Sequence, residues 1–387
     1  MGKLASNVIA LSAILGLMLI LAQVSYLVNA QPPVTLPVIT ISSDGSIQSS
    51  LSPSPIVKEG NTYIINENIS GYGLVIQISN ILFLGEGYTL QGTAQYNTNS
   101  GITIEGNGVS VENVSISEYA TGIDVKGSSN TIIGCSISTY INGINVQGQS
   151  NLIIKNVISL CGGSGIELSG SNNTINKNLL IGGTDIQIYG NQNRVTENTI
   201  TGNNIFDASK FSGGLSSYGI NFNDPATQNT VEKNSIINNF MGIGLDKQTN
   251  LFYLNNFINN TYNVRLHIFA DPSAPYSLNV FDNGSLGNYW GDYISKYPYA
   301  REIGNSGIYN TPYVINGNIT DNYPLTSQLN IGTIPTPTST PTIAPTSLPT
   351  PTPAVQEFPW LVIVPLLLSL FSVAIVVRHR KTANLNQ

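Results

Sequence analysis

The hexad Gly101-Ile-Thr-Ile-Glu-Gly106 is followed by three near copies, Gly122-Ile-Asp-Val-Lys-Gly127, Gly143-Ile-Asn-Val-Gln-Gly148 and Gly165-Ile-Glu-Leu-Ser-Gly170. More divergent hexads continue the series and begin at Asp185, Gly219, Gly242 and Asn263. Consecutive hexads start 21, 21, 22, 20, 34, 23 and 21 residues apart. Each hexad alternates apolar and polar positions, which is typical of a β-strand that buries one face.

A second marker keeps the same period between the hexads. It is an Asn or a Cys shortly before a recurrent Ile, Leu or Phe, at Asn113, Cys135, Asn156, Asn178, Asn198, Asn234 and Asn255. We interpret the asparagines as an internal ladder whose side-chain amides form hydrogen bonds along a stack of coils. The ladder that we predict consists of Asn156, Asn178, Asn198, Asn234 and Asn255.

A repeat of this length, with several short strands and no helical pattern, predicts one coil of a parallel β-helix. The fold class is therefore all-β, with about 8–10 coils of about 21 residues each. We expect irregular first coils and a cap in 38–100, regular repeats in 101–278 and a capping segment in 279–325. The Leu-x-x-Leu-x-Leu pattern and helical half of a leucine-rich repeat are absent from the sequence.

Composition excludes two classes of protein. Charged residues make up 9% of the 387 residues, and 15 Lys and Arg against 21 Asp and Glu leave a net charge of −6. A basic nucleic-acid binder is excluded, because it needs a positive field to meet phosphates. Charge-driven disorder is excluded as well, since 41% of the residues are hydrophobic. We expect a monomer without a nucleic-acid partner.

The N-terminal segment predicts export. Residues 1–30 hold Lys3 and a long apolar run that ends near Val28, and Val28-Asn29-Ala30 fits a small-residue cleavage site. We interpret 1–30 as a secretory signal peptide. The run is also long enough for an uncleaved anchor, and both interpretations place the following residues outside the cell.

The C-terminal segment predicts an anchor. Residues 333–357 are rich in Pro and Thr and read as an extended stalk. Residues 358–377 form an uncharged run long enough to be a transmembrane helix. Arg378, His379, Arg380 and Lys381 open the tail 378–387, which places this tail in the cytoplasm. We therefore expect a single-pass protein of the cell membrane whose large domain, 31–332, is extracellular.

Three motifs near the end of the repeats carry a family resemblance. They read Gly287-Asn-Tyr-Trp-Gly-Asp-Tyr293, Thr311-Pro-Tyr313 and Asp321-Asn-Tyr-Pro-Leu325. They resemble the motifs of archaeal surface members of the NosD family, and the segment Glu357-Phe-Pro-Trp360 resembles the sorting signals of archaeal surface proteins. The resemblance spans 38–325 and implies a right-handed parallel β-helix. It implies copper delivery for NosD itself and carbohydrate binding or hydrolysis for wider relatives.

The sequence offers few metal ligands. Copper sites use clustered soft or imidazole ligands, and the expected exterior domain holds only His267, Met241, Cys135 and Cys161. Gly304–Asn310 lacks the carboxylates that many relatives carry before Thr-Pro-Tyr, which argues against calcium there. We predict neither a metal nor another cofactor. The two cysteines can be buried free thiols, a disulfide or, least simply, metal ligands.

The long 34-residue step marks an insertion between Asn198 and Gly219, and the hexads after it are the most charged. Inserted loops often carry the site of a repeat protein. The candidate ligand-binding residues are Asp224, Asp246, Arg265, His267, Asp207 and Lys210. Three interpretations stay open, namely surface charge that blocks sheet growth, glycan binding and acid–base catalysis. A separate pair, Asp124 and Glu167, lies two coils apart, at about 9.6 Å by strand spacing.

Six Asn-X-Ser/Thr sequons begin at Asn68, Asn113, Asn172, Asn259, Asn283 and Asn318. We expect Asn113 to face inward as a ladder residue.

The function that the sequence favours is a membrane-anchored binding or structural display module directed at glycans or surface proteins. An extracellular polysaccharide lyase, hydrolase or epimerase is the first alternative, and a copper-delivery protein is the second. No catalytic residue is assigned.

Overall fold

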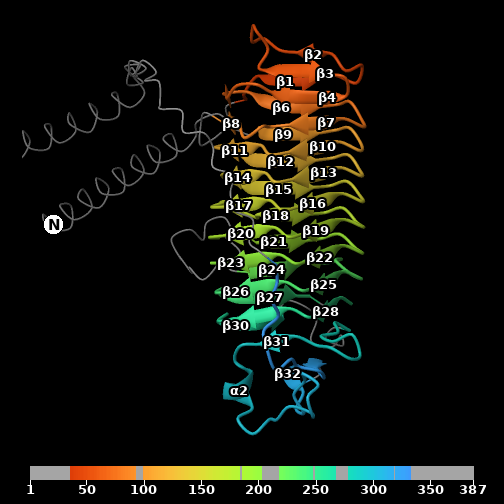
Figure 1. Cartoon of the computed structure of the whole chain (residues 1–387), viewed down its shortest axis with the longest axis vertical. Coiled ribbons are helices and arrows are strands. Elements are labelled where there is room, and N and C mark those ends of the chain that lie inside the picture. The colour runs from red at the N-terminus through yellow and green to blue at the C-terminus, as the bar shows by residue number, and fades with distance from the viewer. Residues whose placement is uncertain are drawn as a thin grey trace, which may run out of the picture. The chain divides into compact units, whose positions relative to one another are not determined.

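The computed structural model describes residues 35–92, 99–183, 185–202, 218–246, 249–266, 278–317 and 319–332. They form three long sheets of nearly all parallel strands (Figure 1). Each coil places one strand in each sheet, and the chain then returns to the first sheet one coil further along. This arrangement confirms the all-β, parallel β-helix prediction. The expected signal peptide, stalk and membrane helix lie outside the described residues.

The first sheet, sheet 1, contains the hexads. In spatial order its strands are β2 (Ile47–Gln48), β1 (Val38–Ile41), β6 (Gly73–Ile76), β9 (Ser100–Ile104), β12 (Thr121–Val125), β15 (Asn142–Val146), β18 (Ile166–Leu168), β21 (Ile186–Ile188), β24 (Tyr218–Phe222), β27 (Met241–Leu245) and β30 (Tyr262–Leu266).

Sheet 2 follows each hexad after a turn. Its strands, in reverse spatial order, are β3 (Ile56–Glu59), β4 (Thr62–Ile65), β7 (Leu82–Leu84), β10 (Ser110–Glu112), β13 (Thr131–Ile133), β16 (Leu152–Ile154), β19 (Thr174–Asn176), β22 (Arg194–Thr196), β25 (Thr230–Glu232) and β28 (Leu251–Tyr253).

Sheet 3 closes each coil. Its strands are β5 (Ile69–Ser70), β8 (Thr89–Gln91), β11 (Ser115–Ser117), β14 (Ser136–Ser138), β17 (Val157–Ser159), β20 (Leu179–Ile181), β23 (Thr199–Thr201), β26 (Ser235–Ile237), β29 (Asn256–Ile258) and β31 (Tyr289–Trp290). A short helix, α2 (Tyr293–Lys296), and an antiparallel hairpin of β32 (Tyr313–Asn316) and β33 (Ile319–Asp321) follow it. Over the described ranges no helix has the length and apolar character that a membrane crossing requires.

The hexads stack in register. Ile102, Ile123, Ile144 and Ile166 are successive partners in parallel pairs, and all four are fully buried. The long step in the sequence does not break this register, because Ile186 pairs with Ile220 across it. The inserted segment, 203–217, lies outside the described residues.

The ladder asparagines are buried and linked from coil to coil. Asn156 Oδ1 accepts the backbone N–H of Cys135 at 2.9 Å, and the N–H of Asn156 in turn donates to Asn178 Oδ1 at 2.9 Å. The same pattern continues through Asn198, Asn234 and Asn255, all of which are buried. Each ladder side chain satisfies backbone groups that the turn leaves without a strand partner.

The expectation that Asn113 faces inward is wrong. Asn113 is exposed, with a left-handed φ of 53°. Val114, which is 1% exposed, takes the buried place before the Ser115–Ser136 pair. The coil is therefore one residue shorter than the spacing from Asn113 suggested, and the Asn ladder stops at Cys135.

The ladder ends in the motifs near the C-terminus. Asn288 Oδ1 accepts the N–H of Asn255 at 3.0 Å, and the N–H of Asn288 donates to Asp321 Oδ2 at 2.6 Å. Trp290 Nε1 donates to the same carboxylate oxygen at 2.8 Å. We call 287–325, which contains these residues, the C-terminal cap. Its motifs close the open end of the stack.

Candidate functional site

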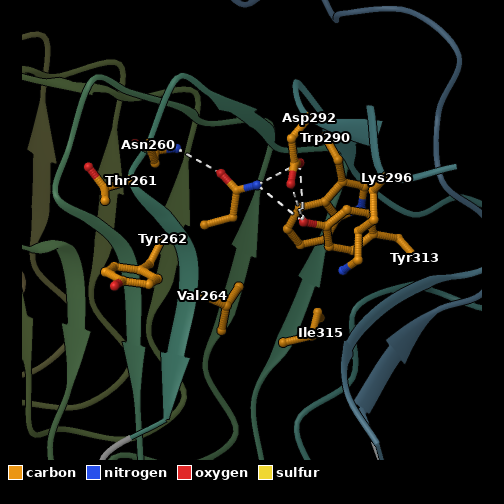
Figure 2. Close-up of a pocket in the computed structure, with 10 residues that line it drawn as sticks. Asn260, Thr261, Tyr262, Val264, Trp290, Asp292, Lys296, Tyr313 and Ile315 are labelled. Atoms are coloured by element: carbon orange, nitrogen blue, oxygen red, sulfur yellow. Dashed lines mark hydrogen bonds between the residues drawn. The ribbon is translucent and has the colours of Figure 1, made fainter. Parts of the chain in front are cut away.

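A cleft of about 200 Å³ lies where the last strand of sheet 1, β30, meets the C-terminal cap. It is lined by Asn260, Thr261, Tyr262, Asn263, Val264, Trp290, Asp292, Lys296, Tyr313 and Ile315. Figure 2 shows side chains from both parts converging on it. The two parts are far apart in sequence and are brought together only where the stack ends.

The aromatic side of the cleft extends the hydrophobic core. Phe257 stacks on Trp290 with 4.4 Å between ring centroids, and Trp290 stacks on Tyr313 at 4.1 Å. Lys296 covers the Tyr313 ring, with Nζ 4.1 Å from its centroid. Such a contact between an ammonium group and a ring face is favourable by about 0.5–1 kcal/mol at an exposed site. Tyr313 is therefore held on both faces.

The polar side is a hydrogen-bonded network. The Tyr313 hydroxyl donates to the Asp292 carboxylate, whose oxygens lie 3.0 and 3.1 Å away. Asn263 Nδ2 donates to Asp292 Oδ1 at 2.9 Å, and Asn260 Nδ2 donates to Asn263 Oδ1 at 3.3 Å (Figure 2). Burial raises the pKa of Tyr313 above its usual range, so the phenol stays protonated as a donor.

Tyr262 forms the rim of the cleft and is 49% exposed. Phe240 supports its ring edge-on at 5.6 Å, and the Arg265 guanidinium carbon lies 5.6 Å from its centroid. Arg265 makes no ion pair with any described carboxylate. The cleft thus has a half-exposed ring and a cation at its mouth.

The structure places only part of the predicted ligand group near this cleft. Arg265 is at the rim. Burial raises the pKa of Tyr218, which the charge of Arg265 lowers and that of Asp246 raises. Asp224 is exposed on the turn after β24. His267, Asp207 and Lys210 lie outside the described residues.

The pair Asp124 and Glu167 lies on the outer face of sheet 1, with Asn145 between the two residues in register. Asn145 Nδ2 donates to Asp124 Oδ1 at 2.9 Å, and Asn142 Nδ2 donates to Glu167 Oε2 at 2.9 Å. Burial raises the pKa of Asp124. Each carboxyl group is therefore bonded to neighbouring amides, as in a polar ladder on a sheet surface.

Sequence reasoning missed the cap side of the cleft. Trp290, Asp292 and Tyr313 belong to the motifs at 287–293 and 311–313, which we read only as marks of family membership. A grouped set of aromatic and acidic residues was the available signal. Nothing in the sequence showed that these residues would meet Tyr262.

The described residues do not fit a copper ion, the metal that the resemblance implies. No group of three or more His, Cys, Asp or Glu among them is arranged to hold a metal. Cys135 and Cys161 are buried free thiols. Burial raises the pKa of Cys135 to about 12 and raises that of Cys161, whereas copper binds the thiolate.

Comparison with solved structures finds distant similarity. A mutant tailspike protein of the E. coli bacteriophage HK620 is 14% identical, with 58% of this chain and 48% of the tailspike covered and a TM-score of 0.37. Tailspike protein 2 of bacteriophage CBA120 is 12% identical, with 57% and 37% covered and a TM-score of 0.41. An alginate lyase of a Paenibacillus strain is 12% identical, with 52% and 93% covered and a TM-score of 0.30. The chain spans about half the length of the HK620 tailspike.

Sequence comparison identifies a family. No curated protein matches the chain significantly. The family described as NosD, periplasmic copper-binding protein, matches residues 57–295, which is more than half of the chain and includes nearly all of the stacked coils. This protein therefore belongs to the NosD family.

Proposed function

We propose that this protein is a glycan-binding β-helix displayed at the cell surface, and that the ligand binds in the cleft between β30 and the C-terminal cap. The observation that carries the proposal is the half-exposed Tyr262 ring at the mouth of a polar cleft. Display outside the cell, with attachment to the membrane, rests on the expected segments 1–30, 333–357 and 358–377.

The cleft offers the two kinds of contact that a sugar ring needs. A sugar has an apolar face of C–H groups, which packs on an exposed aromatic ring such as Tyr262. Its hydroxyl groups act as donors and acceptors, and they match the Asn263 amide and the carboxylate of Asp292. These polar groups are already oriented by their own hydrogen bonds, which lowers the entropic cost of binding.

The composition of the lining favours binding over glycoside hydrolysis. Hydrolysis by the usual mechanism uses two carboxyl groups on opposite sides of the scissile bond. Among the ten lining residues Asp292 is the sole carboxylate, and it is engaged by Tyr313 and Asn263. A bound sugar would therefore be held by the cleft without a second acid to complete the reaction.

Replacing Tyr262 tests the proposal. Purified 31–332 is first screened on a glycan array, and the affinity for the best ligand is then measured by calorimetry. Tyr262→Ala should weaken binding about tenfold, which corresponds to about 1.4 kcal/mol. Its melting temperature should change little, because half of the ring surface already faces solvent.

Tyr299→Ala is the matched control. Tyr299 is 92% exposed and is not among the lining residues of the cleft. This variant should bind as tightly as the unmodified protein. The proposed site would be contradicted if Tyr262→Ala bound as tightly as the unmodified protein, or if Tyr262→Ala and Tyr299→Ala lost the same amount of affinity.

A further inference from the structure

Five of the six sequons lie within the described residues, and in all five the asparagine is exposed. They begin at Asn68, Asn113, Asn172, Asn259 and Asn283. The sixth, at Asn318, lies outside the described residues. The ladder asparagines, in contrast, are buried. The described sequon asparagines thus face outward, whereas the ladder asparagines face inward.

The residue two positions after the asparagine also differs between the two sets. A sequon needs Ser or Thr two residues after the asparagine. The ladder residue Asn156 is followed at that distance by Ile158, which is fully buried. Asn172 is followed by the half-exposed Thr174 at the start of β19. A group attached to Asn172 therefore extends away from the core.

Hydrogen bonding distinguishes the exposed sequons from one another. Asn113, Asn172 and Asn259 all have left-handed backbone angles, with φ of 53°, 58° and 51°. Asn259 Nδ2 donates to Asn238 Oδ1 at 2.7 Å. The side chains of Asn113 and Asn172 form no hydrogen bond with any residue that the structure describes. Of these three sequon asparagines, Asn113 and Asn172 are therefore the ones whose side-chain nitrogen is accessible to a sugar donor.

We infer that Asn113 and Asn172 are N-glycosylation sites and that Asn259 stays unmodified. The donor is a sugar activated as a phosphate ester. The amide Nδ2 attacks the anomeric carbon of this sugar, an N–C bond forms, and the C–O bond to phosphate breaks. The amide loses one proton, the phosphate leaves with the bonding electrons, and nothing is oxidised or reduced.

The position of the Asn259 sequon agrees with this assignment. Its Thr261 lines the candidate cleft, so a glycan on Asn259 would stand at the mouth of the cleft. The bond from Asn259 to Asn238 keeps that amide engaged. The other two sequons start at turns in the coils of β10 and β19, away from the lining residues.

Glycopeptide mass spectrometry of the full chain from its native host tests the assignment. We expect sugar mass on the peptides of Asn113 and Asn172 and none on the peptide of Asn259. Thr174→Val keeps Asn172 and nearly preserves the side-chain shape at position 174, but it removes the sequon. It should therefore eliminate the sugar from that peptide. Thr174→Ser restores the sequon and should retain the sugar.

Three results would overturn the inference. They are unmodified Asn113 and Asn172 in the recovered protein, modification of Asn259 equal to that of Asn172, and sugar retained in Thr174→Val. If Thr174→Val fails to accumulate, Ser115→Ala gives the same readout at Asn113, because Ser115 is the hydroxyl residue of that sequon.

Discussion

Asp185 stands at a position that glycine holds in six of the other seven hexads. Its side chain is fully buried, and Gln187 Nε2 donates to Oδ2 at 2.5 Å. Oδ1 has no hydrogen-bond partner among the described residues. Burial raises the pKa of Asp185 to about 8, although hydrogen bonds from Gln187 and Ser164 act in the opposite direction. The folded protein therefore holds a proton on this group at neutral pH.

This proton makes stability depend on pH. Unfolded Asp185 has the ordinary pKa of 3.8 and releases the proton in acid, whereas the folded state keeps it up to about pH 8. The contribution of the protonated Asp185 to the free energy of unfolding is therefore full below about pH 4 and is lost as the pH rises toward 8. Asp185→Asn cannot ionise and retains an acceptor for Gln187. We expect its free energy of unfolding, relative to the unmodified protein, to increase from pH 4 to pH 8.

Urea denaturation of both proteins at pH 4, 6 and 8 measures that difference. Other groups that titrate in this range, such as Asp321, are present in both proteins and cancel in the comparison. Gln187→Glu, which would place a second carboxyl group beside Asp185, should steepen the pH dependence. Identical pH profiles for Asp185→Asn and the unmodified protein would show that Asp185 does not hold the proton.

At the scale of elements, the C-terminal cap supplies the hydrogen-bond acceptors that each coil otherwise receives from the next coil. Asp321 supplies the acceptor for the N–H of Asn288 and for Trp290 Nε1, and its other oxygen accepts the N–H of Tyr323 at 3.0 Å. Removing this carboxylate leaves buried donors unpaired, at about 1–3 kcal/mol for each group. Stacked repeats contact only their neighbours, so the damage should stay local.

Hydrogen exchange tests this locality. In Asp321→Ala we expect faster amide exchange in β28, β29 and β31, which lie next to the cap, and unchanged exchange in β12 and β13. Thr320→Ala is the control, since Thr320 is half-exposed and outside the ladder. Uniformly faster exchange along the whole stack would mean that the coils unfold as one unit and that the cap is not a local closure.

Much of the repeat could be predicted from the sequence, because each strand of sheet 1 carries the same alternation. The hexads and the ladder through Asn156 and Asn178 follow from spacing alone. A second buried ladder was also within reach and was missed. It joins Asn130, Asn151, Asn173, Asn193, Asn229 and Asn250 through the same kind of bond. The error at Asn113 arose because this asparagine holds the left-handed turn position one residue before the ladder position, which Val114 occupies in that coil.

The cleft was not predictable in the same way. Tyr262 belongs to the last hexad, whereas Trp290 and Tyr313 come from motifs outside the repeat. Their meeting depends on how the cap folds back over the end of the stack, and no period in the sequence carries that information. Among the charged residues after the insertion that the sequence offered as candidates, Arg265 lies at the rim.

At the scale of the whole molecule, we propose that the sequence after the stack, 333–357 and 358–377, holds the described domain at a distance from a membrane. The inner coils are hydrogen-bonded to both neighbours, and the stack encloses a continuous apolar core. The Pro- and Thr-rich composition of 333–357 predicts a segment that does not fold into a core. Protease sensitivity should therefore be concentrated in this segment rather than in the coils.

Protease treatment of intact cells that carry a C-terminal tag tests the expected topology. Added protease should cut within 333–357 and release a fragment that retains the fold of 31–332, while the tag after Gln387 stays protected until the cells are lysed. We expect this pattern because a membrane would shield a cytoplasmic tail, whereas a Pro- and Thr-rich stalk would have neither a core nor a bilayer to protect it. Deleting 358–387 should instead release the protein into the medium without protease. Loss of the tag from intact cells, or a fragment that appears only after lysis, would place the domain on the other side of the membrane.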